Sequence, residues 1–200
     1  MTNLQHIDPR IPILLPPPDH PTDVCTDGDW LRLEQRLGTR LPDDVKEFNR
    51  LYGLGEIGDW MMPLVPRLRR GPDWLEEQCG AAGVVQIVSD GLDPRARPLR
   101  AFPMVGGALA WAASNNGDFW VWLTTGEPEE WTVAVIPRHP DSHLNADGTL
   151  SWTSIYFYDM GATTYLAELI GGRLTDKFTV GVTATFDLSD FKPWLWREHL

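Results

Sequence analysis

The sequence predicts an α+β fold in a single domain, with an antiparallel or mixed β-sheet meander packed against a few short helices. Two stretches with helical spacing of apolar residues lie between Asp29 and Gly58. From Leu99 onward, strand-like runs alternate with turn residues. The chain has 200 residues, of which 42% are hydrophobic, and this is enough for one sizeable core.

The first helix is expected to begin after Thr26. Thr26 and Asp29 have the spacing of a capping box, in which two side chains satisfy backbone N–H groups at the start of a helix. Gly38 is expected to end this helix. The apolar residues at helical spacing between these limits are Trp30, Leu33 and Leu37.

A second helix is expected to begin at Leu41-Pro42. Proline fits the first turn of a helix, and the carboxylates of Asp43 and Asp44 suit its positive end. Its apolar stripe comprises Val45, Phe48, Leu51 and Tyr52. The glycine-rich stretch from Gly53 to Gly58 then predicts a tight connection from this helix into a strand. A phosphate-binding loop is not favoured there, because the loop leads out of a helix and no Lys-Ser/Thr pair follows.

Most of the remaining chain predicts strands joined by turns. Asn115-Asn116-Gly117 has the composition of a hairpin turn with positive φ. Both faces of the run Phe119–Leu123 are apolar. One face should therefore meet the helices, and the other should either be covered as well or remain exposed as a binding surface. The predicted strands are Asp59–Val65, Leu99–Pro103, Ala108–Ser114, Asp118–Thr124, Trp131–Ile136 and Trp152–Tyr158.

Other segments are assigned from turn signals and periodicity. Pro72–Cys79 predicts a short helix, and Val84–Val88 fits either its continuation or a strand. Pro137–Thr149 predicts a polar loop. A closing helix should begin at Asp159 or Gly161 and end at Gly171-Gly172. Apolar residues alternate with Thr and Gly from Phe178 to Phe186, which predicts a half-buried strand at a sheet edge.

The expected organisation is a proline-rich leader over residues 1–25, a domain over residues 26–173 and a carboxyl-terminal extension over residues 174–200. The leader is expected to be a simple extension, either packed on the domain or loose. The alternative is that it is a proline-rich ligand for another domain. In the extension, one group of residues is expected to cover remaining apolar surface or to form a hook that contacts a partner: Phe191, Trp194, Leu195 and Trp196.

Composition narrows the classes of partner. The formal net charge of −11 and the pI of about 4.8 argue against nucleic acid and anionic membranes, which are bound by clustered Lys and Arg. Such a charge suits a basic partner, or solubility alone. Cys25 and Cys79 are expected to be reduced thiols, although the sequence leaves a disulfide between them open. With neither a signal peptide nor a membrane-spanning segment evident, we expect a soluble, cytoplasmic protein.

The sequence contains little that points to catalysis or to a cofactor. His139 and His143 have a zinc-ligand spacing, but Pro137 and Pro140 oppose the helix that this spacing requires. Cys79 is interpreted as a small apolar residue and not as a nucleophile. The clustered carboxylates of the turn at residues 127–130 are expected to be solvated and therefore poor acid–base groups. We expect no catalytic, cofactor-binding or metal-binding residues and a protein that is not an enzyme.

The order and spacing of several motifs resemble the Smi1/Knr4 superfamily, also called SUKH. The motifs are Trp30, Leu33-Glu34, Leu37-Gly38, Leu41-Pro42-Asp43-Asp44, Phe48, Tyr52-Gly53-Leu54-Gly55, Asn116-Gly117-Asp118, the strand at Trp131 and the helix from Tyr165 to Gly171. The resemblance spans about Asp29 to Arg173. It implies a SUKH-like fold and a binding role, since bacterial members are mostly immunity proteins that neutralise polymorphic or contact-dependent toxins, many of them nucleases, by direct binding.

The resemblance and the acidic charge together imply a basic toxin domain, encoded nearby, as the partner of a monomer or weak dimer. The candidate contact residues are Asp43, Asp44 and Glu47 on the second helix, Glu127, Glu129 and Glu130 on the turn, and Trp60 and Trp122 as aromatic anchors. The competing interpretation is that these acids are merely solvated and the tryptophans lie in the core. The alternative function is a regulatory scaffold like the fungal members, which would bind several proteins through its termini. An enzyme with an unrecognised site ranks last.

Overall fold

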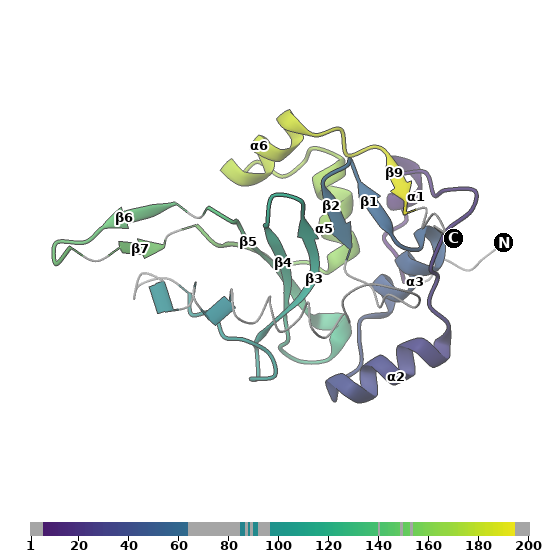
Figure 1. Cartoon of the computed structure of the whole chain (residues 1–200), viewed down its shortest axis with the longest axis horizontal. Coiled ribbons are helices and arrows are strands. Elements are labelled where there is room, and N and C mark those ends of the chain that lie inside the picture. The colour runs from purple at the N-terminus through teal and green to yellow at the C-terminus, as the bar shows by residue number, and fades with distance from the viewer. Residues whose placement is uncertain are drawn as a thin grey trace, which may run out of the picture.

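An antiparallel sheet lies at the centre of the structure, a computed structural model that describes residues 6–63, 85–86, 88, 90–91, 97–139, 141–148, 150–152 and 154–194. Within these residues the sheet has seven strands in the order β8-β5-β4-β3-β2-β1-β9, and every pairing is antiparallel. Helices pack against it in one domain, which confirms the predicted α+β class (Figure 1).

The strands of the main sheet are β1 (Gly55–Ile57), β2 (Met61–Pro63), β3 (Ala108–Ser114), β4 (Phe119–Leu123), β5 (Thr132–Ile136), β8 (Tyr156–Tyr158) and β9 (Phe191–Pro193). A separate pair comprises β6 (Ser142–Leu144) and β7 (Leu150–Trp152). The helices are α1 (Ile11–Leu14), α2 (Asp27–Leu37), α3 (Asp43–Tyr52), α5 (Ala162–Ile170) and α6 (Lys177–Thr185), with a 3₁₀ turn η1 at Pro128–Glu130.

The two predicted amino-terminal helices are present as α2 and α3. The hydroxyl of Thr26 accepts the N–H of Asp29 at 3.3 Å, and the Asp29 carboxylate accepts the N–H of Thr26 at 2.8 Å. This is the capping box that the sequence predicts. Gly38 ends α2 in the left-handed conformation, with φ of 73°. The sequence pattern is therefore enough to locate both ends of α2.

The glycine-rich connection after α3 is itself a strand, where only a helix-to-strand turn was predicted. β1 pairs with β2 on one side and with β9 on the other. A Cβ atom at Gly55 would lie 2.5 Å from the carbonyl oxygen of Lys192, so β9 can approach only because residue 55 is glycine. The predicted strand 59–65 is shorter as β2, and its residues 64 and 65 lie outside the described part of the chain.

The predicted meander is confirmed in β3, β4 and β5. The turn between β3 and β4 includes Gly117 at a φ of 88°. Trp120 and Trp122 of β4 face the helices and belong to the main core. Val121 and Leu123 belong to a second buried cluster on the other face, together with Val85, Val88 and Leu99. Both faces of β4 are therefore covered, which removes the alternative of an exposed binding surface there.

Two predicted strands are corrected. Leu99–Pro103 forms only an isolated bridge between Ala101 and Ala108, because Pro98 and Pro103 lack the N–H groups that a ladder needs. The predicted strand Trp152–Tyr158 is divided between β7 and β8. The predicted loop Pro137–Thr149 contains β6, which pairs with β7 in a hairpin that projects away from the main sheet (Figure 1). The predicted helix Pro72–Cys79 lies outside the described residues. For the segment Val84–Val88, where the sequence left a helix or a strand open, the described residues 85, 86 and 88 are helical, as are residues 90 and 91.

The predicted edge strand Phe178–Phe186 is wrong, since this segment is helix α6. Asp176 caps the helix by accepting the N–H of Thr179 at 3.0 Å. Phe178, Val182 and Phe186 pack on the core, and their spacing of four residues is also a helical stripe. The alternating pattern contains this stripe within it, so the period alone did not distinguish a strand from a helix.

The leader is packed into the main core and is not a loose arm. Ile11 and Leu15 are buried, and the carbonyl of Leu15 accepts the Tyr52 hydroxyl at 2.5 Å. Likewise, Phe191 of β9 is buried, and Trp194 packs partly on the same core. Residues 195 and 196 of the predicted hook lie outside the described part. Across the described residues, none of the helices has both the length and the apolar character needed to cross a bilayer.

Candidate functional site

Acidic residues from two distant segments meet beside one arginine. Arg40, between α2 and α3, donates from Nη2 to the carboxylate of Glu129 in η1 at 2.9 Å. The hydrogen bond that Arg40 donates to Glu129, together with the charges of Glu129, Asp43 and Glu127, raises the pKa of Arg40. We call Arg40, Asp43, Glu127, Glu129 and Glu130 the acidic face. The structure thus brings together four of the eight predicted contact residues.

The turn that carries the glutamates is anchored by its neighbours. The carboxylate of Glu130 accepts the N–H of Glu127 at 3.1 Å, which closes the turn. Pro128 and Trp131 are buried, and the Trp131 indole N–H donates to the carbonyl of Gly126 at 3.3 Å. Glu127, Glu129 and Glu130 remain exposed. The backbone therefore presents these carboxylates to solvent from a fixed position.

Asp43 belongs to this exposed group, although a lysine partly neutralises it. Lys46 lies 3.2 Å from the Asp43 carboxylate and 2.7 Å from that of Glu34. The carboxylates here number five, namely Glu34, Asp43 and the three glutamates of the turn. The cations number two, Arg40 and Lys46, so three carboxylates are in excess. The acidic face therefore keeps a net negative charge after its internal ion pairs are taken into account.

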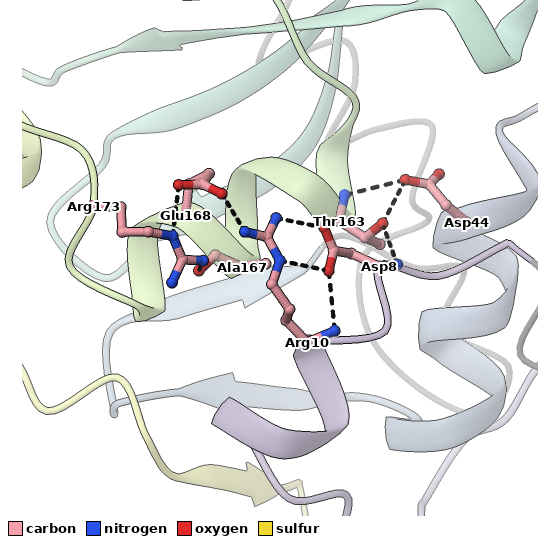
Figure 2. Close-up of polar contacts among 7 residues, drawn as sticks. All are labelled: Asp8, Arg10, Asp44, Thr163, Ala167, Glu168 and Arg173. Atoms are coloured by element: carbon pink, nitrogen blue, oxygen red, sulfur yellow. Dashed lines mark hydrogen bonds and ion pairs between the residues drawn. The ribbon is translucent and has the colours of Figure 1, made fainter.

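Asp44, the next residue, is directed into the protein. Its Oδ2 atom accepts the backbone N–H of Thr163 at 3.1 Å and the Thr163 hydroxyl at 3.0 Å, as Figure 2 shows. Gly161 at the start of α5 has no side chain to cap that helix, so Asp44 of α3 caps it instead. Burial raises the pKa of Asp44. This residue holds two helices together and is not available on the surface.

A network of ion pairs holds the leader beside this cap (Figure 2); we call Asp8, Arg10, Glu168 and Arg173 the clamp. The guanidinium of Arg10 lies 2.7 Å from the Asp8 carboxylate and 2.5 Å from that of Glu168 on α5, and Arg173 lies 2.8 Å from Glu168. These hydrogen bonds lower the pKa of Asp8, mainly through Arg10, and that of Glu168, mainly through Arg173. The N–H of Asp8 donates to Thr163 at 3.2 Å, which joins the clamp to the Asp44 cap.

Three further predicted contact residues are buried. Trp60 and Trp122 are 1% and 2% exposed, so the interpretation of both as surface anchors is corrected. Trp60 stacks on Phe186, the residue after α6, with ring centroids 4.9 Å apart, and it also contacts Phe178 of α6, so this segment covers the Trp60 ring. Glu47 is 3% exposed and pairs with Arg50. Within the described residues its Oε1 atom has no hydrogen-bond partner.

A cleft of about 540 Å³ lies between α6 and the end of the β4–β5 pair. Trp60, Phe178 and Phe186 supply aromatic surface to the cleft, and Arg138 and His139 also line it. Asp118 in this cleft already accepts the Ser114 hydroxyl at 2.5 Å and the N–H of Arg138 at 3.0 Å. Its carboxylate thus orders the β3–β4 turn.

Arg40 is a member of the acidic face that was not among the predicted contact residues. The signal that could have found it is the position of a cation directly before Leu41-Pro42, at the exposed corner where α3 begins. Its partner Glu129 lies 89 residues away, so only the fold shows the pairing. Among the described residues, no group of three or more His, Cys, Asp or Glu side chains is placed to hold a metal ion.

No protein-family model, curated protein or solved structure matches the chain.

Proposed function

We propose that this chain is a non-enzymatic binding module of the SUKH type, and that it is an immunity protein that neutralises a basic toxin domain by direct binding. The observation that supports it most is the acidic face, where Asp43, Glu127 and Glu129 converge from two segments and remain accessible. The motif resemblance from Asp29 to Arg173 supplies the family, and the net charge of −11 agrees with a basic partner.

The mechanism follows from charge complementarity. A basic domain is drawn toward a surface of opposite potential, which raises the association rate, and the effect is screened by salt. Glu127, Glu129 and Glu130 lie on an anchored turn, so little backbone order has to be gained on binding. Bound there, the immunity protein blocks access of the toxin to its substrate.

The arrangement of the interior carboxylates also supports a binding role over an enzymatic one. Oδ2 of Asp44 and both carboxylate oxygens of Asp118 accept backbone N–H or hydroxyl donors, while within the described residues the buried Oδ1 of Asp44 has no hydrogen-bond partner. Each therefore orders a helix start or a turn. A general acid or base instead needs a carboxyl group that reaches a substrate proton.

The scaffold alternative assigns partner binding to the termini. Ile11, Leu15 and Phe191 from these segments are buried in the main core, so they are occupied within the fold. This supports the immunity role over the scaffold role. Deletion of residues 1–25 is unsuitable as a test of the scaffold role, because it would remove core side chains such as Ile11 and Leu15. Exposed positions such as Pro16 and Pro17 are the appropriate ones to substitute in the leader.

The test is co-expression of the protein with each product of the genes beside its own. We expect one neighbouring product to be toxic alone, to be neutralised by this chain and to co-purify with it. Neutralisation should weaken in the double variant Glu127→Gln/Glu129→Gln and persist in Asp159→Asn/Asp190→Asn, which removes the same charge at exposed positions elsewhere. If no neighbour is toxic, or if toxicity persists on co-expression, the immunity role is wrong.

A further inference from the structure

Two apolar side chains stand exposed at the tip of the loop before β3. Val105 is 90% exposed and Met104 is 54% exposed. The tip is held by backbone bonds, since the N–H of Gly107 donates to the carbonyl of Met104 at 2.7 Å and the N–H of Phe102 donates to Ala108 at 3.1 Å. Phe102 packs partly on the main core. These two side chains are therefore presented to solvent from an anchored loop.

This loop tip lies against the segment that leads into the acidic face. The N–H of Gly106 donates to the carbonyl of Thr124 at 3.1 Å, and the N–H of Thr124 donates to Gly107 at 3.0 Å. Glu127 follows three residues after Thr124. Figure 1 shows the start of β3 and the end of β4 at the same end of the sheet, as their antiparallel pairing requires.

Chain geometry limits the distance between the loop tip and η1. One residue from Val105 to Gly106, one backbone hydrogen bond and three residues from Thr124 to Glu127 together span at most about 20 Å. A standard protein–protein contact of about 800 Å² on each partner is roughly 30 Å across. The loop tip and the glutamates of η1 therefore fit within a single footprint.

We propose that the loop tip and the acidic face form one contact surface for a basic protein domain, in which Met104 and Val105 enter an apolar recess and the glutamates meet surrounding Lys or Arg side chains. This deepens the proposed function and rests on it. An apolar centre beside a charged rim is the usual composition of a specific interface. Arg100, which precedes the loop, is an exposed cation and is not part of the proposed surface.

The charge distribution selects a basic protein over other partners. The four carboxylates of the acidic face, at Asp43 and on η1, repel nucleic-acid phosphates and anionic lipid headgroups. Two apolar side chains alone bury too little surface to anchor the protein in a neutral membrane. A basic domain satisfies both features, because its cations pair with the carboxylates while an apolar recess covers the loop tip.

The first experiment follows the methyl resonances of Met and Val residues of the full chain by NMR during titration with an amphipathic peptide of leucine and lysine. We expect the largest shifts at Met104 and Val105, and none with a matched peptide of leucine and glutamate. Largest shifts at other methyl groups would overturn the proposed surface. So would the same shifts with neutral phosphatidylcholine vesicles, or on changing the protein concentration alone, which would indicate a membrane or a second copy.

Matched variants separate the two parts of the surface. Val105→Ser and Glu127→Gln/Glu129→Gln should each weaken peptide binding about tenfold, the loss expected when an interface contact worth about 1.4 kcal/mol is removed. The controls are Ile13→Ser, a comparably exposed apolar residue on α1, and Asp159→Asn/Asp190→Asn. Both should stay within about twofold of the parent protein. Equal losses in variants and controls would contradict the surface.

The same variants in the co-expression assay distinguish the two proposals. If the peptide binds at the loop tip but no neighbouring gene product is neutralised, the immunity role fails and the surface stands. If neutralisation occurs and survives the combination of Val105→Ser with Glu127→Gln/Glu129→Gln, the surface fails and the immunity role stands.

Discussion

Helices α2 and α5 both begin with capped N–H groups, but the capping residues come from different places. Thr26 and Asp29 cap α2 from within four consecutive residues. α5 begins at Gly161, which lacks a side chain, and its cap is the carboxylate of Asp44 from α3, 119 residues away from Thr163 in the sequence. The same hydrogen-bond requirement is therefore met locally in one helix and by tertiary packing in the other.

The difference concerns what each cap holds together. The local cap stabilises α2 alone, whereas Asp44 also joins α3 to α5 and, through Thr163, to the N–H of Asp8 in the leader (Figure 2). Removing the second cap thus affects three segments. Its neighbour Asp43 has the same side chain but points to solvent, and so offers a matched control for every substitution at Asp44.

The largest effect is expected from Asp44→Ala. It leaves the Thr163 N–H and hydroxyl without their acceptor inside a packed junction, which should lower the free energy of unfolding by about 2–3 kcal/mol. Urea unfolding of Asp44→Ala, Asp44→Asn and Asp43→Ala measures this. Asp44→Asn retains an acceptor oxygen and should lose much less. Equal stability of Asp44→Ala and Asp43→Ala would contradict the tertiary cap.

A smaller loss is expected from Thr26→Ala at the local cap. The substitution removes the acceptor for the Asp29 N–H and should lower the free energy of unfolding by about 1 kcal/mol, the usual value for an N-cap. Amide hydrogen exchange should show the increase confined to the first turn of α2. By contrast, Asp44→Ala should increase exchange at the start of α5 and in the leader together. Exchange that increases throughout the protein in Thr26→Ala would remove the distinction.

The pH dependence of stability should have opposite signs at the two caps. Hydrogen bonds from Thr26 hold the pKa of Asp29 below its usual 3.8, so its contribution to stability is present above pH 3.8 and is lost as the pH falls through the lower folded value. Burial raises the pKa of Asp44 above 3.8, so its contribution is lost as the pH rises through the higher folded value. Relative to Asp44→Asn, the parent protein should therefore become less stable as the pH rises from 3.8. A relative gain in stability over that range would contradict this sign.

The smallest effect on stability is expected on the acidic face. Glu129→Gln breaks the ion pair with Arg40, whose two side chains are 44% and 52% exposed, and should change the free energy of unfolding by less than about 0.5 kcal/mol. The contrast with Asp44→Ala tests whether the two groups of carboxylates have separate roles. A loss near that of Asp44→Ala would show that Glu129 is structural.

The sequence pattern identified α2, α3, the β3–β4–β5 meander and the closing helix α5, because each has a strong period between clear end signals. The pattern did not identify α6. Its apolar residues alternate as in a strand, but Phe178, Val182 and Phe186 are also four residues apart, which is the spacing of one face of a helix. Asp176 and the contacts of Phe178 and Phe186 with Trp60 decide for the helix. The bounds of short strands such as β7 and β8 also depended on which partner strand was within reach.

The candidate site shows the same division. Glu127, Glu129 and Glu130 could be placed on a surface turn from the sequence alone, because proline and clustered charges occur together there. Trp60 and Trp122 could not be assigned to the surface or the core, since an aromatic side chain fits either. Their burial depends on α6 and on the helices that cover β4.

By itself the sequence determined the α+β class, the local helix ends and the acidic charge, because each follows from neighbouring residues or from composition. Only the tertiary structure decided that Asp44 faces inward while Asp43 is partly exposed, that Arg40 meets Glu129, and that the loop of Met104 and Val105 bonds to Thr124. Each of these depends on which segments pack together. Adjacent residues on a helix point in different directions, and their environments are set by residues distant in the sequence.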